Sequence, residues 1–299
     1  MKILITGVAG FIGSHLADKL IKDHKVIGVD NFLLGSRNNI EHLLKNPDFT
    51  FYECDILNTK EFEKLFRIHS IDTIFHLAAN SDISNSDPKN DFQNTLSTTL
   101  VVLEKCRIRG IKQFIFASSG SVYGETTSAV TESDCGLPIS HYAAAKISSE
   151  AFISSYCSMY DIQSWICRLP NVIGPRLTHG CIYDFKKQIQ SGVKELKVLG
   201  DGNQRKPYMY VTDVCDAMVY IRQNAKERIN VFNISTQGQT SVREIAELIT
   251  DLPKVYAGGD RGWAGDCPYY KADFSRLTEL GFKAGMNSTE AVKYTIYET

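Results

Sequence analysis

Short apolar runs alternate with longer segments of helical periodicity through the first 170 residues of this 299-residue chain. The short runs are apolar at successive positions, as in strands that are buried on both faces of a sheet. Strands are predicted at residues 2–5, 25–29, 50–52, 73–77, 114–117 and 165–167. Helices are predicted between them, at residues 11–21, 60–68, 91–107 and 141–160. Because parallel strands need right-handed helical crossovers, this alternation predicts an α/β fold with a doubly wound parallel sheet.

The pattern becomes less regular after Pro170. Stretches rich in Gly, Pro, Asn and Asp are typical of loops, and they occupy residues 177–181, 200–207 and 251–268. Helices are still predicted at residues 214–222, 242–249, 274–280 and 289–297, with a strand at residues 231–234. We therefore predict a Rossmann-type main domain over residues 1–170, with a return of the chain to its sheet near residues 210–235. Most of residues 171–299 should form a smaller, mixed α/β lobe.

Bulk composition narrows the function classes. With 33 basic and 34 acidic residues the net charge is −1, which gives no support for binding to nucleic acid or to a membrane surface. No apolar run approaches the ~20 residues of a membrane helix, and the first strand leaves no room for a signal peptide, so a cytoplasmic location is expected. The eight cysteines form no CxxC pair, and we expect free thiols without a metal site or a disulfide framework.

A glycine-rich segment, Thr6-Gly-Val-Ala-Gly-Phe-Ile-Gly13, joins the first predicted strand to the first helix. Gly7 suits a tight turn, Gly10 lets the backbone approach a pyrophosphate, and Gly13 lets the helix pack closely on the sheet. Phe11 and Ile12 lie in the first turn, where free N–H groups and the helix dipole favour phosphate. An ordinary glycine turn is the alternative, but the strand before it and the helix after it favour a dinucleotide site.

Acidic residues at the ends of the next two strands extend this interpretation. Asp30, 23 residues after Gly7, can accept hydrogen bonds from the adenosine ribose, and its neighbour Asn31 lies at the same strand end. A carboxylate there repels a 2′-phosphate, so the sequence favours NAD over NADP. Asp55 and Ile56 can flank the adenine, although a capping Asp is an equally good interpretation.

Catalytic side chains are expected on the helix at residues 141–160. Tyr142 and Lys146 lie four residues apart and therefore on one helical face. A phenol with an ordinary pKa of ~10 is a poor base at pH 7, and a neighbouring ammonium or a cationic nicotinamide lowers that pKa. Ser119 and Ser121 follow the strand at residues 114–117, where hydroxyls can hold a substrate oxygen. On its own, Tyr-x-x-x-Lys would be a chance surface pair.

With these motifs in this order, the chain resembles the extended short-chain dehydrogenases/reductases, specifically the NAD-dependent nucleotide-sugar epimerase/dehydratase family, and within it the UDP-glucose 4-epimerase-like members. The resemblance runs through nearly the whole chain. The matching stretches are TGVAGFIGSHL (6–16), VDN (29–31), HLAA (76–79), SSGSVYG (118–124), YAAAK (142–146), RLPNVIGP (168–175), THGCIYDF (178–185), GDGNQ (200–204), YMYVTDV (208–214) and RGWAGD (261–266).

This resemblance implies roles for individual residues. It implies Ser119, Tyr142 and Lys146 as the catalytic group and NAD as the cofactor, held by the glycine segment, by Asp30 and by the residues around the fourth strand. The cofactor-binding residues around that strand would be Leu77, Ala78, Ala79 and Asn94, with a plain helix-surface role as the alternative for Asn94. The substrate residues would be Ser119, Ser121, Tyr142, Asn171, His179, Lys206, Tyr208, Arg261 and Asp266.

Several of these positions depart from the family pattern. Lys206, with Arg205 beside it, stands where many members have an Arg on the pyrophosphate, and a Lys lacks the bidentate fork. Arg261 and Asp266 are spaced differently from the family's shorter Arg-x-x-Asp form. His179 has a solvated loop role as its alternative.

The implied activity is epimerisation of a nucleotide-diphosphate sugar, foremost at C4 of a UDP-hexose. Dehydratase members carry an Asp-Glu pair after the catalytic Thr, whereas this chain has Gly120 and Ser121 there. Net oxidoreductase, decarboxylase or dehydratase chemistry on such a substrate is one alternative, and a non-catalytic NAD-binding module is another. The family also implies a homodimer through the helices at residues 91–107 and 141–160. The identity of the sugar and of the nucleotide stays open.

Overall fold

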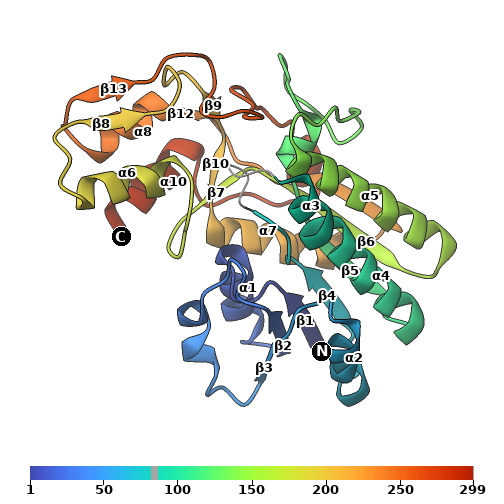
Figure 1. The fold of residues 1–299 in the computed structure, drawn as a ribbon. Helices are drawn as coiled ribbons and strands as arrows, with labels where there is room; N and C mark the ends of the chain where they lie inside the picture. The colour runs from blue at the N-terminus through green and yellow to red at the C-terminus, as the bar shows by residue number, and fades with distance from the viewer. Residues whose placement is uncertain (82–86, 299) are drawn as a thin grey trace.

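A computed structural model describes residues 1–81 and 87–298, with side chains described as far as Tyr297. Seven parallel strands form its central sheet, in the order β11-β6-β5-β4-β1-β2-β3 (Figure 1). Its strands are β1 (Lys2–Thr6), β2 (Lys25–Asp30), β3 (Phe49–Glu53), β4 (Thr73–His76), β5 (Gln113–Ser119), β6 (Gln163–Leu169) and β11 (Ile229–Asn233). This arrangement confirms the predicted doubly wound α/β fold.

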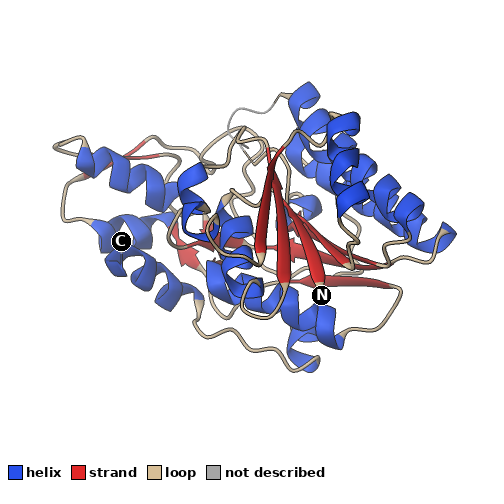
Figure 2. Cartoon of the chain, turned by 90° about the horizontal axis from the view of Figure 1, so that it is seen from below, coloured by secondary structure: helices blue, strands red, loops and turns tan. Residues whose placement is uncertain are grey.

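Helices cover both faces of this sheet (Figure 2). One face packs against α1 (Phe11–Leu20), α7 (Val211–Asn224) and α9 (Ser275–Glu279). The other face packs against α2 (Thr59–Ile68), α4 (Thr98–Arg109) and α5 (His141–Met159). Successive side chains of a strand point to opposite faces, so along β1 Ile3 and Ile5 enter the first core and Leu4 enters the second.

A smaller core holds the second lobe together. Three helices contribute to it: α6 (Cys181–Gln190), α8 (Val242–Ile249) and α10 (Ser288–Glu298). Beside them lie three pairs of short strands: β7 (Asn171–Ile173) with β10 (Tyr208–Tyr210), β8 (Leu196–Val198) with β13 (Lys254–Tyr256), and β9 (Arg205–Lys206) with β12 (Thr240–Ser241). Between visits to this lobe, α7 and β11 return the chain to the main sheet, where β11 pairs with β6.

The helix predicted at residues 91–107 has a different form. It is built from α3 (Pro88–Asp91), the π-helical turn η3 (Phe92–Ser97) and α4. The helix begins earlier than predicted because Asp87 caps it, accepting from the Lys89 N–H, and because Pro88 suits the first helical position. Turns of the π type are rare in proteins, and those that occur are frequently found at functional sites. This turn contains Asn94.

Elements of the smaller lobe were missed for two reasons. Strands of two or three residues are too short to show an alternating pattern. Helix α6 does carry apolar residues at helical spacing, since Ile182 and Phe185 are both buried. Its start lacks the usual signal, because Gly180 precedes it with φ of 93° and provides no side-chain cap. In the part of the chain that the structure describes, no helix has the length and apolar character needed to cross a membrane.

Candidate active site

One cavity of about 960 Å³ lies where the carboxyl ends of the sheet strands meet the smaller lobe. Its lining contains every predicted site residue except Arg261, from Gly7 in the first loop to Asp266 near the end of the chain. Carboxyl ends of parallel strands are the usual place for a ligand in this type of fold. The fold thus gathers residues from widely separated motifs around a single space.

The glycine segment forms one end of this cavity. Gly7 has φ of 70°, and a Cβ on Gly13 would lie only 2.1 Å from the Gly7 carbonyl oxygen. Gly10 precedes α1 and provides no side-chain cap, and the first turn carries no acidic residue. The N–H groups at the start of α1 are therefore available to an anion, and the backbone geometry fits a dinucleotide pyrophosphate.

Asp30 connects the two loops at this end of the cavity. Its Oδ2 accepts from the Ala9 N–H at 2.9 Å and its Oδ1 accepts from the Phe32 N–H at 2.8 Å. The side chain is buried, which raises its pKa, while these backbone hydrogen bonds act in the opposite direction. A third backbone hydrogen bond comes from Asn31, and since the two carboxylate oxygens have about four acceptor positions in all, one position remains for a ribose hydroxyl.

The two residues beside Asp30 at the rim also have local partners. Asp55 Oδ1 accepts from the Leu57 N–H at 2.8 Å while Asp55 lines the cavity, and the residue that caps α2 is Asn58 instead of Asp55. Asn31 is exposed, and its Oδ1 accepts from the Leu33 N–H at 3.1 Å.

Three successive residues at the end of β5 contact helix α5. The Lys146 Nζ donates to the Ala117 carbonyl oxygen at 2.6 Å, and the Ser119 hydroxyl is hydrogen-bonded to Tyr142. Between them, Ser118 donates to Glu150. The side chains of α5 that the chemistry needs are thus fixed against one strand end.

The hydroxyls continue toward the substrate side of the cavity. Ser121 Oγ donates to Ser119 Oγ at 2.9 Å, so Ser121, Ser119 and Tyr142 form a short chain of hydroxyl groups. Lys146 Nζ lies 4.7 Å from the centre of the Phe116 ring and 5.8 Å from the centre of the Tyr142 ring. This arrangement can hold a substrate hydroxyl and accept its proton.

The electrostatics of this pair correct one expectation from the sequence. Lys146 was expected to lower the pKa of Tyr142, but burial raises the pKa of Tyr142 to about 12, and the hydrogen bond from Ser119 opposes this only in part. Burial also lowers the pKa of Lys146 to about 7, with Glu150 acting in the opposite direction. Loss of hydration therefore outweighs the attraction between ammonium and phenolate when protein atoms alone surround the pair.

A buried histidine next to the catalytic helix was not predicted as a site residue. His76 Nδ1 lies 2.7 Å from Thr6 Oγ1, and its Nε2 lies 3.1 Å from Thr99 Oγ1. Since Thr99 donates to the Thr95 carbonyl oxygen, Nε2 carries the proton and donates to Thr99, and Nδ1 accepts from Thr6. Burial lowers the pKa of His76 to about 3, so it is neutral and joins β1, β4 and α4 beneath the cavity.

Residues of the smaller lobe line the opposite end. Lys206 forms an ion pair with the buried Asp266, whose Oδ2 also accepts from the Gly262 N–H at 3.1 Å. Tyr208 is hydrogen-bonded to Asn171 and lies 3.5 Å from the Cys181 Sγ through its hydroxyl. This end combines cationic side chains, Lys206 and Lys197, with several neutral donors.

Two other predicted substrate residues differ in their positions. His179 is exposed and lines the cavity, with its Nδ1 3.3 Å from Thr178 Oγ1. Arg261 is absent from the lining, and its guanidinium pairs with Glu125 at 2.7 Å and with Asp260 at 3.3 Å.

Tyr270 and Trp263 also line the cavity, and neither was predicted as a site residue. The Tyr270 hydroxyl is buried and has no hydrogen-bond partner among the described residues. A Cβ on Gly120 would lie 2.3 Å from Tyr270 Cζ, so the ring occupies the space that a side chain at position 120 would need. Nothing in the local pattern near residue 270 indicates this long-range contact.

Comparisons with known proteins agree with this architecture. A sequence profile of the NAD dependent epimerase/dehydratase family matches residues 3–235. The chain is 34% identical over 312 residues to the UDP-glucose 4-epimerase of Mycolicibacterium smegmatis, covering 99% of this chain and 97% of that protein.

Solved structures of two related proteins extend this likeness over both lobes. The UDP-glucose 4-epimerase of Thermotoga maritima with UDP-glucose has a TM-score of 0.89 and 33% identity, covering 99% of this chain and 97% of that one. The UDP-glucuronic acid 4-epimerase of Bacillus cereus in complex with UDP-glucuronic acid and NAD has a TM-score of 0.90 and 31% identity, covering 100% and 98%.

Proposed function

This chain belongs to the NAD-dependent epimerase/dehydratase family, and we propose that it inverts C4 of a nucleotide-diphosphate sugar, foremost a UDP-hexose. The observation that carries the proposal is the placement of Ser119 and Tyr142, hydrogen-bonded to each other, on the lining of the one cavity that also contains the dinucleotide loop. The sugar specificities of these related proteins support the substrate class.

The cofactor of this family is NAD, and the residues present fit it. The glycine segment would hold the pyrophosphate, Asp30 would hold the adenosine ribose, and Ala78 and Asn94 line the adjoining wall. When bound, its nicotinamide would supply a hydride acceptor and a positive charge. That charge would act with Lys146 against the burial that raises the pKa of the Tyr142 phenol.

Proton transfer is the task of the chain itself. Tyr142 accepts the proton of the C4 hydroxyl when that position is oxidised, and Ser119 holds the same oxygen through its hydroxyl. The 4-keto sugar then rotates to present its opposite face, and Tyr142 returns the proton to the C4 oxygen. Neighbouring Ser121 can share the proton through Ser119 because its hydroxyl lies 2.9 Å away.

The other end of the cavity would hold the nucleotide part of the substrate. Lys206 offers a cation for a phosphate, although Asp266 shares its charge. Asn171 and Tyr208 offer neutral donors beside it. Elimination of water needs an additional acid near C6, and Gly120 and Ser121 provide no carboxyl group at the positions where dehydratases carry an acid pair.

The product of the reaction tests this proposal. Incubation with a panel of UDP-, TDP-, GDP- and CDP-sugars in deuterated water should give a product of unchanged mass with inverted C4 and no accumulation of NADH. Solvent deuterium should not enter C4, because the hydride that leaves the carbon returns to it. Mass spectrometry and proton NMR of the separated sugar nucleotides measure both quantities.

Each alternative gives a different product. A sugar lighter by one water would make the protein a dehydratase, and accumulation of NADH would make it a net oxidoreductase or decarboxylase. Deuterium at C4 would contradict hydride return. Binding of NAD without turnover of any sugar nucleotide would favour a non-catalytic module.

Asp30 gives a prediction about cofactor choice. The unaltered protein should bind NAD much more tightly than NADP, because the carboxylate repels a 2′-phosphate. Asp30→Ala removes this charge and should narrow the gap between the two dissociation constants, measured by calorimetry. Asp55→Ala, which changes a carboxylate on the same lining, is the matched control and should leave the gap as it is. Equal affinities in the unaltered protein would contradict the assignment.

A homodimer and a cytoplasmic location complete the proposal. Large apolar side chains are exposed along η3 and α5, with Phe92 at 55%, Phe152 at 42% and Met159 at 69% exposure. A second copy of the chain would cover them if α4 and α5 packed against their own equivalents. The cysteines all lie in described residues and are free thiols, which supports a reducing compartment.

A further inference from the structure

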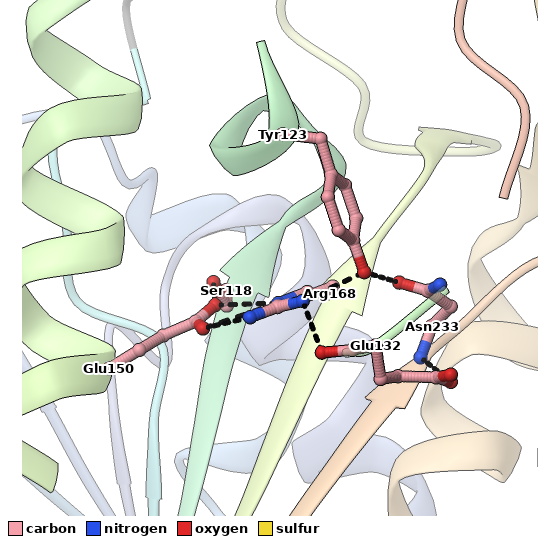
Figure 3. Close-up of polar contacts among 6 residues, drawn as sticks. All are labelled: Ser118, Tyr123, Glu132, Glu150, Arg168 and Asn233. Carbon is pink, nitrogen blue, oxygen red and sulfur yellow. Dashed lines mark hydrogen bonds and ion pairs between the residues drawn. The ribbon is translucent and has the colours of Figure 1, made fainter. Parts of the chain in front are cut away.

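Behind the catalytic helix lies a buried ion pair that the proposed chemistry has not used (Figure 3). Arg168 of β6 and Glu150 of α5 have side chains only 9% and 8% exposed. The Arg168 Nη2 lies 2.7 Å from Glu150 Oε2, and its Nε lies 3.2 Å from both carboxylate oxygens. Ser118 donates to Oε1 as well, so the carboxylate is held by several donors at once.

Other partners fix the guanidinium from the opposite side (Figure 3). Arg168 Nη1 donates to the Tyr123 hydroxyl at 2.8 Å and to the Glu132 carbonyl oxygen at 3.2 Å. Tyr123 in turn donates to Asn233 Oδ1 at 2.7 Å. The position of the Glu150 carboxylate is therefore determined by residues from separate parts of the main sheet and its connections.

Glu150 lies on the same face of α5 as Lys146, one helical turn further along. Lys146 is 3% exposed, and among the described residues it forms no ion pair of its own. Its Nζ donates to a neutral carbonyl oxygen and faces the Phe116 ring. A buried ammonium in such surroundings needs a negative charge nearby to stay protonated.

The other charged and titratable groups around Lys146 do not supply that charge. His76 of β4 is neutral and supplies no charge, while Tyr142 on the same helix is a phenol with a raised pKa. Arg168 is positive and reaches this region through Glu150. Asp91 of α3 acts on Tyr142. Glu150 is the carboxylate whose charge opposes the effect of burial on the pKa of Lys146.

We propose that Glu150, held in place by Arg168, is a positioning residue that keeps Lys146 charged for catalysis. The inference rests on the proposed function, since a charged Lys146 matters only if Tyr142 acts as the base. A buried ion pair contributes little net stability compared with well-packed apolar residues. The Glu150 carboxylate pairs with Arg168, accepts from Ser118 and acts electrostatically on Lys146. This arrangement fits an electrostatic role better than a purely structural one.

The test is the substitution Glu150→Gln, which keeps the shape and removes the charge. A negative charge favours the ammonium form, so its loss should lower the pKa of Lys146. In protein labelled with 13C-lysine, the Cε resonance of Lys146, assigned by its loss in Lys146→Arg, should titrate at least about one pH unit lower in the variant. The alkaline limb of the pH profile of kcat should shift to lower pH by the same amount. At a fixed pH on that limb, turnover should therefore fall about tenfold.

Glu132→Gln is the matched control. The Glu132 side chain accepts from the Asn233 N–H at 2.7 Å within the same cluster, while Arg168 contacts the backbone carbonyl oxygen of this residue, which the substitution keeps. The Lys146 titration and the pH profile should be unchanged in this control. Glu150→Asp keeps the negative charge, so the pKa of Lys146 in this variant should lie close to that of the unaltered protein.

Loss of the Glu150 charge leaves Arg168 unpaired and can prevent folding. In that event the double substitution Glu150→Gln with Arg168→Met takes its place, because it removes both charges together, and the Lys146 titration should again move down. An unchanged Lys146 titration in a folded variant would overturn the inference. This titration needs no substrate, so its failure is distinct from an absence of sugar-nucleotide turnover in the unaltered protein, which would overturn the proposed function.

Discussion

Tyr142→Phe is expected to lower turnover by about 10²- to 10⁴-fold, the usual contribution of a positioned general base. The substitution removes the only atom of this side chain that can accept the C4 hydroxyl proton. The Tyr142 ring stays in place, so bound NAD should be retained. The measurement is kcat for the sugar nucleotide found active in the substrate panel, together with the NAD content of the purified protein.

Tyr156→Phe provides the control on the same helix. The Tyr156 hydroxyl donates to Glu104 at 3.0 Å, and the residue lies outside the cavity lining. Its loss should leave kcat within about twofold, because one partly exposed hydrogen bond contributes ~0.5–1.5 kcal/mol to stability and nothing to proton transfer. Near-normal turnover in Tyr142→Phe would contradict the mechanism.

Gly13→Ala is expected to abolish tight NAD binding, with a loss of affinity of at least about 100-fold, or ~2.7 kcal/mol. The new methyl group would lie 2.1 Å from the Gly7 carbonyl oxygen and 2.9 Å from its carbon. Both are backbone atoms of the phosphate loop, so the loop or α1 has to move, and overpacking of this kind costs ~1–3 kcal/mol or more. Calorimetric titration with NAD and thermal unfolding measure the two effects.

Gly10→Ala is the graded comparison at the same loop. A Cβ on Gly10 would meet only the Gly7 carbonyl oxygen, at 3.2 Å, and the residue already has an ordinary φ of −74°. We expect this variant to keep its unfolding temperature while NAD binding weakens, because the methyl group lies on the surface that faces the phosphates. Equal unfolding temperatures and equal NAD affinities for the two variants would show that the close approach of α1 to the loop is unimportant.

The order of elements in the main domain could be predicted because its signals are local. Strands β1, β2 and β4 each have an apolar centre between polar ends, and the glycine segment marks the start of α1 within one residue. A return of the chain to the sheet was also expected near residues 210–235, and β11 pairs with β6 there. Local pattern was enough where the periodicity came with a clear boundary signal, whereas α6 has the helical spacing and lacks a side-chain cap.

The residues that were missed depend on contacts between distant parts of the chain. Tyr270 fills the space above Gly120, which lies 150 positions earlier, and no nearby residue indicates this. Arg261 has the charge expected of a phosphate ligand, but Glu125 and Asp260 compete for it. The pKa of Tyr142 was expected to fall because sequence spacing reveals the neighbouring Lys146 and conceals the burial that they share.

The contacts at the end of β5 restrict how the length of this chain can vary. Ala117, Ser118 and Ser119 each engage a different residue of α5, Ala117 through its backbone carbonyl oxygen and the two serines through their side chains. One inserted or deleted residue there would turn each following side chain to the opposite face and would separate the serines from their partners. Related chains should therefore gain or lose residues in segments such as 251–268, while the spacing from Ala117 to Ser119 should be the same in every functional relative.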